Sequence, residues 1–144
     1  MTKTAIPLLP LLLMSACQSG GSASLPGDGS DTRPFAGIAA NQTVHFTGTE
    51  PFWGGTVTGA TLTYSTPENS GTGISVQRFA GRGGLSFSGT LGGKALDMMV
   101  TEGACNDGMS DRGYPFTVTL RLGTETRNGC GWTQARPFTG PKNP

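Results

Sequence analysis

The strongest constraint on the fold of this chain is a period of two in its apolar residues from about residue 43 onward. Residues 116–122, for example, read Phe-Thr-Val-Thr-Leu-Arg-Leu. Successive side chains of a β-strand point to opposite faces, so this alternation indicates strands with one buried face. Similar segments occur at residues 44–47, 56–57, 62–64, 74–76, 85–87 and 96–101. Because a helical period is almost absent, the sequence predicts an all-β domain.

Glycines separate these segments at short intervals. Gly59 and the pairs Gly83-Gly84 and Gly92-Gly93 lie where tight hairpin turns need a positive φ, which glycine adopts without steric cost. Such short connections favour a small antiparallel meander. Seven or eight short strands of this kind form either a barrel or a two-layer sandwich, and both remain open at this point.

The N-terminus has the pattern of a bacterial lipoprotein signal. Lys3 supplies a positive charge, residues 6–14 form a short apolar run, and residues 14–17 read Met-Ser-Ala-Cys. Small residues before a cysteine are typical of the cleavage site of such signals. We therefore expect residues 1–16 to be a signal peptide and Cys17 to become an acylated N-terminus that holds the protein at a membrane surface.

Two other interpretations of this segment remain open. A transmembrane helix needs roughly 18 to 20 apolar residues, whereas this run is shorter and contains Pro7 and Pro10. An ordinary secretory signal would leave Cys17 incidental. Each interpretation exports the chain, so we expect a cell-envelope location. Gln18, where an aspartate would favour inner-membrane retention, points to the outer membrane and its periplasmic face.

The composition divides the rest of the chain into three parts. Residues 17–42 are rich in Gly, Ser, Asp and Pro, which predicts the lipidated cysteine followed by a flexible tether. Single apolar residues interrupt this tether at Leu25, Phe35 and Ile38. We expect the β domain at residues 43–138 and a disordered tail at residues 139–144.

The three cysteines of the chain support export. If Cys17 is acylated, Cys105 and Cys130 remain as a disulfide pair, which an oxidising periplasm permits. A metal site is the alternative, but these two cysteines and His45 fall short of the usual four zinc ligands. We therefore predict a disulfide and neither a metal nor a cofactor.

The charge balance gives no reason to expect a nucleic-acid partner. The chain has 10 Lys and Arg against 9 Asp and Glu, and removal of Lys3 with the signal makes the two numbers equal. Proteins that bind nucleic acids concentrate basic residues to neutralise phosphates, and no basic run occurs here.

Two segments are denser in specific residues than a turn requires. Residues 48–53 read GTEPFW, and residues 105–116 read CNDGMSDRGYPF. With Gly129-Cys130, they resemble a family of uncharacterised bacterial envelope proteins, often predicted lipoproteins, that carry GTEPFW, C-x-DGMSD-x-x-YPF and a later GC. This chain has Gly113 before the tyrosine of the second motif. The resemblance implies a small envelope β domain and supplies no catalytic residues.

The second motif is typical of a structural corner. Asp107 and Asp111 can hydrogen-bond locally, and Arg112 can pair with either carboxylate. The functional alternative is that these carboxylates converge with Glu50 or Glu102 on a cation or act as an acid and base. A calcium loop normally has several oxygen ligands spaced two residues apart, so we favour the structural interpretation.

The aromatic pair Phe52 and Trp53 is interpreted as part of the core, with a ligand contact as the alternative. His45 lies between two apolar residues, so we expect it to face solvent. The residues that could form a binding surface are Glu50, Phe52, Trp53, Asp107, Asp111, Arg112 and Tyr114.

We expect a non-enzymatic envelope lipoprotein, because no catalytic motif occurs in the chain. Its β domain is expected to bind a protein, a glycan or a small ligand at the membrane surface, and its other partner is the membrane itself, through the lipid. One alternative is a structural or assembly accessory without a ligand site. The other is an enzyme with an unrecognised carboxylate site.

Overall fold

The structure is a computed structural model, and it describes residues 32–142. These residues form eight strands and no helix. The strands are β1 (Val44–Thr49), β2 (Phe52–Thr58), β3 (Thr61–Thr66), β4 (Asn69–Ala80), β5 (Gly84–Leu91), β6 (Lys94–Cys105), β7 (Tyr114–Leu122) and β8 (Glu125–Trp132). The signal peptide and the acylation predicted at Cys17 lie outside the described residues. No helix within residues 32–142 is long and apolar enough to cross a membrane.

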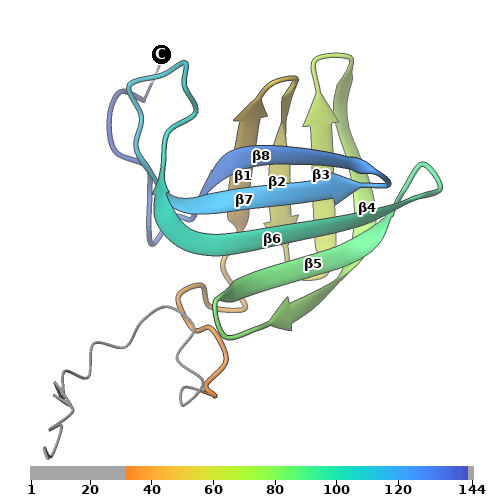
Figure 1. The fold of residues 1–144 in the computed structure, drawn as a ribbon, viewed down its shortest axis with the longest axis horizontal. Coiled ribbons are helices and arrows are strands. Elements are labelled where there is room, and N and C mark those ends of the chain that lie inside the picture. Colours follow the sequence, from red (N-terminus) through yellow and green to blue (C-terminus); the bar gives the residue numbers. More distant parts are fainter. Residues whose placement is uncertain (1–31, 143–144) are drawn as a thin grey trace, which may run out of the picture.

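The eight strands form a closed antiparallel barrel. Each strand pairs with the next one along the chain, and β8 returns to pair with β1. In Figure 1, β6, β7 and β8 cross the upright strands β1, β2 and β3 at a steep angle. The structure therefore confirms the predicted antiparallel all-β fold and selects the barrel over the two-layer sandwich.

The interior of the barrel is filled by side chains. In β7, Tyr114, Phe116, Val118 and Leu120 are buried and alternate with more exposed residues, as the period of two predicts. The same alternation brings inward-facing residues from every strand except β8 to one apolar core. Its largest fully buried side chains include Phe46, Phe87, Phe116, Leu62, Leu85, Leu96, Met98 and Leu120.

The predicted hairpin glycines are confirmed at two turns and wrong at the third. Gly59, Gly92 and Gly93 have φ values of 58°, 57° and 78°. Neither Gly83 nor Gly84 has a positive φ. Gly84 serves a different purpose, because a Cβ at this position would overlap the carbonyl oxygen of Val100 on β6. The missing side chain lets β5 and β6 approach each other there.

The segment before β1 belongs to the folded domain, so the prediction of a tether up to residue 42 is wrong for its last part. Ile38 is only 2% exposed and Phe35 packs against the same core. The Phe35 N–H donates to the Gly81 carbonyl (2.7 Å), and Arg78 donates to the Ile38 carbonyl (3.0 Å). The physical reason is that a barrel has open ends, and these two apolar side chains cover one of them.

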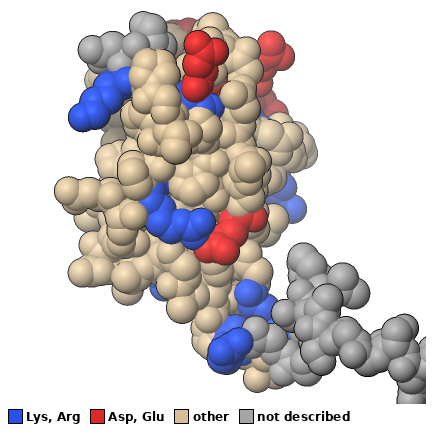
Figure 2. All heavy atoms as spheres, turned by 90° about the vertical axis from the view of Figure 1, so that its left-hand side faces the viewer, with Lys and Arg blue, Asp and Glu red and all other residues tan. Residues whose placement is uncertain are grey.

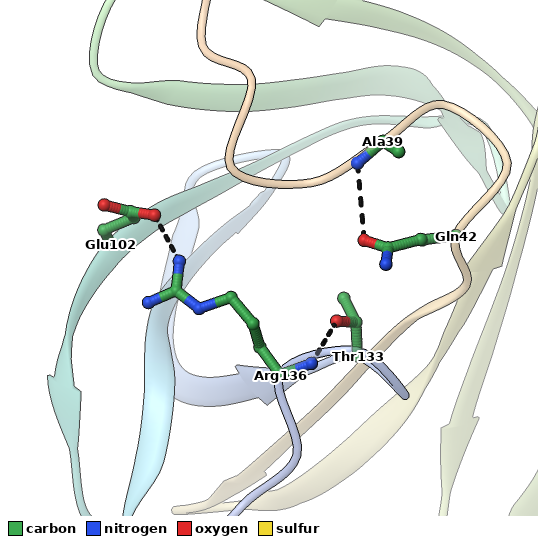
Figure 3. Close-up of polar contacts among 5 residues, drawn as sticks. All are labelled: Ala39, Gln42, Glu102, Thr133 and Arg136. Atoms are coloured by element: carbon green, nitrogen blue, oxygen red, sulfur yellow. Dashed lines mark hydrogen bonds and ion pairs between the residues drawn. The ribbon is translucent and has the colours of Figure 1, made fainter.

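The segment after β8 lies against the same end. The Arg136 guanidinium pairs with Glu102 and lies 4.6 Å from the ring centre of Phe116. The backbone N–H of Arg136 donates to the Thr133 hydroxyl oxygen (3.1 Å; Figure 3). A Cβ on Gly37 would lie 2.6 Å from Glu102 Oε1. The segments before β1 and after β8 therefore meet at Glu102.

The disordered tail predicted from residue 139 is not found as far as residue 142. Thr139 forms an isolated bridge with Gly113, with N–H to carbonyl distances of 3.1 and 2.8 Å. The prediction failed because these contacts are made with the loop between β6 and β7, which is distant in the sequence.

At the opposite end of the barrel, a polar group closes the core. Arg127 donates to the Tyr64 hydroxyl and pairs with Glu125 (2.9 Å). Burial raises the pKa of Tyr64, while the nearby Arg127 acts in the opposite direction. The phenol therefore stays neutral at physiological pH and accepts the arginine's hydrogen bond.

Candidate functional site: a groove where the two motifs meet

The loop between β6 and β7 is organised around one carboxylate. Asp107 accepts hydrogen bonds from the Met109 N–H (3.0 Å), the Ser110 N–H (2.8 Å), the Ser110 hydroxyl (2.7 Å) and the Tyr114 hydroxyl (2.9 Å). Gly108 has a φ of 75°, so glycine is needed at this point of the turn. The DGMSD sequence thus folds into a corner whose centre is Asp107.

These hydrogen bonds control the charge of Asp107. Burial alone would raise the pKa of this carboxyl, but the hydrogen bonds from Ser110, Met109 and Tyr114 outweigh it and hold the pKa well below its usual range. Asp107 is therefore a carboxylate at any physiological pH. Its oxygens are occupied by donors of its own loop.

Arg112 does not pair with either aspartate of the motif, contrary to the expectation from the sequence. Its guanidinium donates to the carbonyls of Pro141 (2.8 Å) and Lys142, and lies 4.5 Å from the ring centre of Phe138. Both carbonyls belong to the irregular segment after β8, which folds back over the corner. Asp111 is exposed and makes no side-chain hydrogen bond within residues 32–142.

The first motif places its two aromatic residues on opposite sides of the barrel wall. Trp53 is 3% exposed and faces the core, whereas Phe52 is 51% exposed. The interpretation as core is confirmed for Trp53 and wrong for Phe52, because adjacent strand residues point in opposite directions. Gly48 is the cross-strand partner of Trp53, and a Cβ there would overlap the indole nitrogen. That indole N–H is buried without a partner in the described part of the chain.

A hydrogen bond joins the two motifs, and the disulfide ties the second motif to β8. The hydroxyl of Thr49, the second residue of the first motif, donates to the Asp107 carbonyl (3.0 Å). Cys105 and Cys130 form the predicted disulfide, with 5.6 Å between their Cα atoms. The cysteine count predicts this disulfide. The sequence does not reveal that the GTEPFW segment lies beside the same corner.

A groove of about 330 Å³ lies where these elements meet on the outer wall. Pairing between β1 and β8 spans only three residue pairs, from His45 with Trp132 to Thr47 with Cys130. Beyond the last pair the two strands are no longer joined, and the groove occupies that place. Its lining comes from Thr47, Gly48, Thr49, Cys105, Asn106, Asp107, Thr117, Val118, Thr119, Asn128, Gly129 and Cys130.

The groove presents both hydrogen-bonding and apolar surface and carries little charge. Threonine hydroxyls and the Asn128 amide supply hydrogen-bonding groups, and Asp107 is the acidic residue in the lining. Figure 2 looks at the side of the molecule that is on the left in Figure 1, and most of this face is uncharged. Such a surface suits a neutral or weakly charged ligand better than a strongly anionic one.

Two of the carboxylates considered for a catalytic or cation site, Glu102 and Asp107, are engaged in other contacts. Glu102 pairs with Arg136 at the barrel end that residues 35–38 cover, and Asp107 is used by its own turn. Within residues 32–142, no group of three or more His, Cys, Asp or Glu side chains could hold a metal ion. The groove offers hydrogen-bonding groups and a recessed shape to a ligand.

Sequence reasoning missed a cluster of aromatic rings beside the corner. Trp132 stacks on His45 (5.1 Å between ring centres) and contacts Tyr114 (5.6 Å) and Phe138 (5.5 Å). His45 faces outward as expected, but it is half-buried by Trp132. Tyr114 is 3% exposed, so it supports the corner from below and is not a surface residue. The only sign of this cluster in the sequence is that each of these positions holds an aromatic residue.

Comparison of the chain with protein-family models, with curated proteins and with solved structures found no match. The resemblance through the GTEPFW and DGMSD segments therefore stays a prediction.

Proposed function

We propose that this protein is a non-enzymatic lipoprotein of the bacterial cell envelope, anchored through acylated Cys17, whose barrel binds a partner protein in the groove between β1, β8 and the corner. The anchor would place the barrel at the periplasmic face of the outer membrane. The proposal for the anchor depends on the signal-like sequence of residues 1–17.

One observation carries the binding role: the two motifs that stand out in the sequence line the same groove. The core of the barrel is filled, with side chains such as Phe116 and Leu96 fully inaccessible, so the interior offers a ligand no room of this size. A groove on the wall, held open by a hydrogen-bonded corner and a disulfide, is preorganised for binding.

Two exposed apolar residues close to groove residues favour a protein over a glycan: Phe52 is the cross-strand partner of Thr49, and Met109 is two residues after Asp107. Phe52 follows the turn after β1, and Met109 lies at the tip of the corner; they are 51% and 68% exposed. Exposed aromatic and methionine side chains beside a recess are common in protein interfaces. A glycan would gain from the hydroxyl lining but would have little use for Met109.

An enzyme with a carboxylate site receives no support from this geometry. Asp107 cannot deliver a proton near neutral pH, because its pKa is depressed and its oxygens already accept four hydrogen bonds. A purely structural accessory would not need a preorganised groove, although it could share the fold.

The anchor is tested by metabolic labelling with a fatty-acid analogue. The wild-type protein should be labelled and should fractionate with the outer membrane, whereas Cys17→Ser should lose the label. An unlabelled wild-type protein would show that the N-terminal segment has been misinterpreted.

The groove is tested by crosslinking the acylated full chain in its own envelope and identifying the captured protein. Phe52→Ala with Met109→Ala should abolish capture, and so should Asn128→Arg, which fills the groove from an exposed position. The matched control is Phe79→Ala with Met99→Ala, which removes equally exposed apolar side chains elsewhere. Capture that survives the first two changes, or binding of a glycan instead, contradicts the proposal.

A further inference from the structure

A second exposed apolar surface lies on the wall formed by β4, β5 and β6. Phe79 and Met99 are 68% and 53% exposed. Both are cross-strand partners of Ser86, so they flank this small residue on three adjacent strands. Together with the glycines of the β4–β5 turn, they border an apolar recess of about 290 Å³. We call Phe79, Ser86 and Met99 the apolar patch.

The neighbouring rows of the wall are polar and internally satisfied. Asp97, two residues before Met99, accepts hydrogen bonds from Ser88 (2.8 Å) and Arg121 (2.7 Å). On the other side, the hydroxyls of Thr101 and Thr117 are bonded to each other (2.6 Å). The patch is therefore a bounded apolar spot on a polar wall, which is typical of a contact surface.

The chain that leads to Cys17 leaves the domain beside this patch. Phe35, near the start of the described residues, is bonded through its N–H to the carbonyl of Gly81 in the β4–β5 turn (2.7 Å). Gly81 also borders the apolar recess. In Figure 1 the described chain begins at the foot of the barrel, next to the β4–β5 hairpin. The segment that precedes Phe35 therefore joins the domain beside the apolar patch.

The charged residues of the β4–β5 hairpin and of the start of β6 are basic, whereas Asp97, further along β6, is paired with Arg121. Between Asn69 and Leu96 the sequence contains Arg78, Arg82 and Lys94 and no acidic residue. Arg82 is exposed in the turn that ends β4. Figure 2 shows basic side chains at the foot of the molecule, where the described chain begins. Anionic phospholipid headgroups attract such a cationic rim, and apolar side chains inside the rim enter the acyl boundary.

We propose that the apolar patch and Arg82 form a membrane-contact surface, which lays the β4–β6 wall on an anionic phospholipid bilayer and leaves the groove accessible. This inference rests on the proposed lipid anchor for its orientation.

Vesicle binding tests the surface without the anchor. The probe is the mature chain, residues 17–144 with Cys17→Ser, mixed with vesicles of three parts phosphatidylethanolamine to one part phosphatidylglycerol. Phe79→Ser with Met99→Ser should lower the partition coefficient about tenfold, as loss of two partly buried apolar side chains predicts. Phe52→Ser with Met109→Ser is the matched control and should have no effect. Arg82→Glu should weaken binding to these vesicles and not to pure phosphatidylcholine.

Photocrosslinking tests the same surface in the acylated protein. A benzoyl-phenylalanine in place of Phe79 should crosslink to phospholipid, and the same residue in place of Phe52 should not. Crosslinking from position 79 to a second copy or to another protein would overturn the proposal, and so would equal vesicle binding by both double variants. Acylation is measured separately. If the wild-type protein is not labelled, the anchor is refuted, and the vesicle experiment still decides whether the apolar patch contacts membranes.

Discussion

Two aspartates of the same motif have different roles at the level of single residues. Both carboxylates were expected to stabilise the corner, because both lie among turn-forming residues. The structure gives Asp107 four hydrogen-bond donors and leaves the Asp111 side chain exposed. Composition identifies the turn, but which carboxylate turns inward depends on the backbone path through Gly108.

We predict that Asp107→Asn lowers the free energy of unfolding by about 0.5 to 2 kcal/mol, as lost capping and loop hydrogen bonds do. The folded pKa of Asp107 lies below the unfolded value of about 3.9, so its contribution is fully present above about pH 5 and is lost progressively as pH falls from the unfolded value towards the folded pKa. Thermal melts from pH 3 to pH 7 should show the difference from wild type shrinking in acid. Asp111→Asn is the control; an equal loss there would contradict this account.

Gly48 shows how a residue without a side chain determines the position of a large one. A Cβ at Gly48 would overlap the Trp53 indole, which is buried beneath it. Gly48→Ala should therefore cost about 1 to 3 kcal/mol through overpacking and shift the fluorescence of Trp53. Gly83→Ala, where nothing lies within 4 Å of the new Cβ, should change stability by less than about 0.5 kcal/mol. Equal melts for the two variants would show that the indole moves aside freely.

At the scale of elements, the weakest join in the barrel is the one between β1 and β8. Only three residue pairs connect them, against seven between β7 and β8. The disulfide ties the end of β6 to Cys130, which forms the last residue pair between β8 and β1. The cross-link and the motif corner therefore reinforce the wall where its pairing stops.

Removal of the disulfide should destabilise the domain strongly. Cys105 and Cys130 are 25 residues apart, and closing a loop of that length is worth roughly 3 to 4 kcal/mol. Cys105→Ser with Cys130→Ser should lower the unfolding midpoint by roughly 10 °C or more. Reduced wild-type protein should match the double variant. A midpoint within about 2 °C of the oxidised protein would mean that the corner holds without its staple.

The strands were the most predictable elements, and one turn was the least. Alternation of apolar and polar residues is a local property, so segments such as residues 116–122 are recognisable without knowing the fold. Gly83-Gly84 shows the limit of that reasoning. Glycine in a turn usually supplies a positive φ, but Gly84 is required by the close approach of the Val100 carbonyl, which belongs to another strand.

At the scale of the whole molecule, the sequence left barrel and sandwich undecided for a physical reason. Alternation states which residues are buried and does not state what covers them. Closure of the barrel depends on the pairing of the last strand, β8, with the first strand, β1, and no local sequence pattern encodes that pairing. The groove was unpredictable for the same reason, since it exists only because closure brings GTEPFW beside the β6–β7 corner.

The cover over the end of the barrel gives the last prediction. Residues 32–42 looked like tether because apolar residues are sparse there, yet Ile38 is 2% exposed and holds Arg78 through its carbonyl. A chain that starts at Thr43 should lose about 2 to 4 kcal/mol relative to one that starts at Thr32, comparable to removing a buried side chain. Ile38→Ala in the longer chain should reproduce most of that loss, whereas exposed Ala36→Ser should not. If the shorter chain melts with the longer one, the domain begins at β1 and the cover is dispensable.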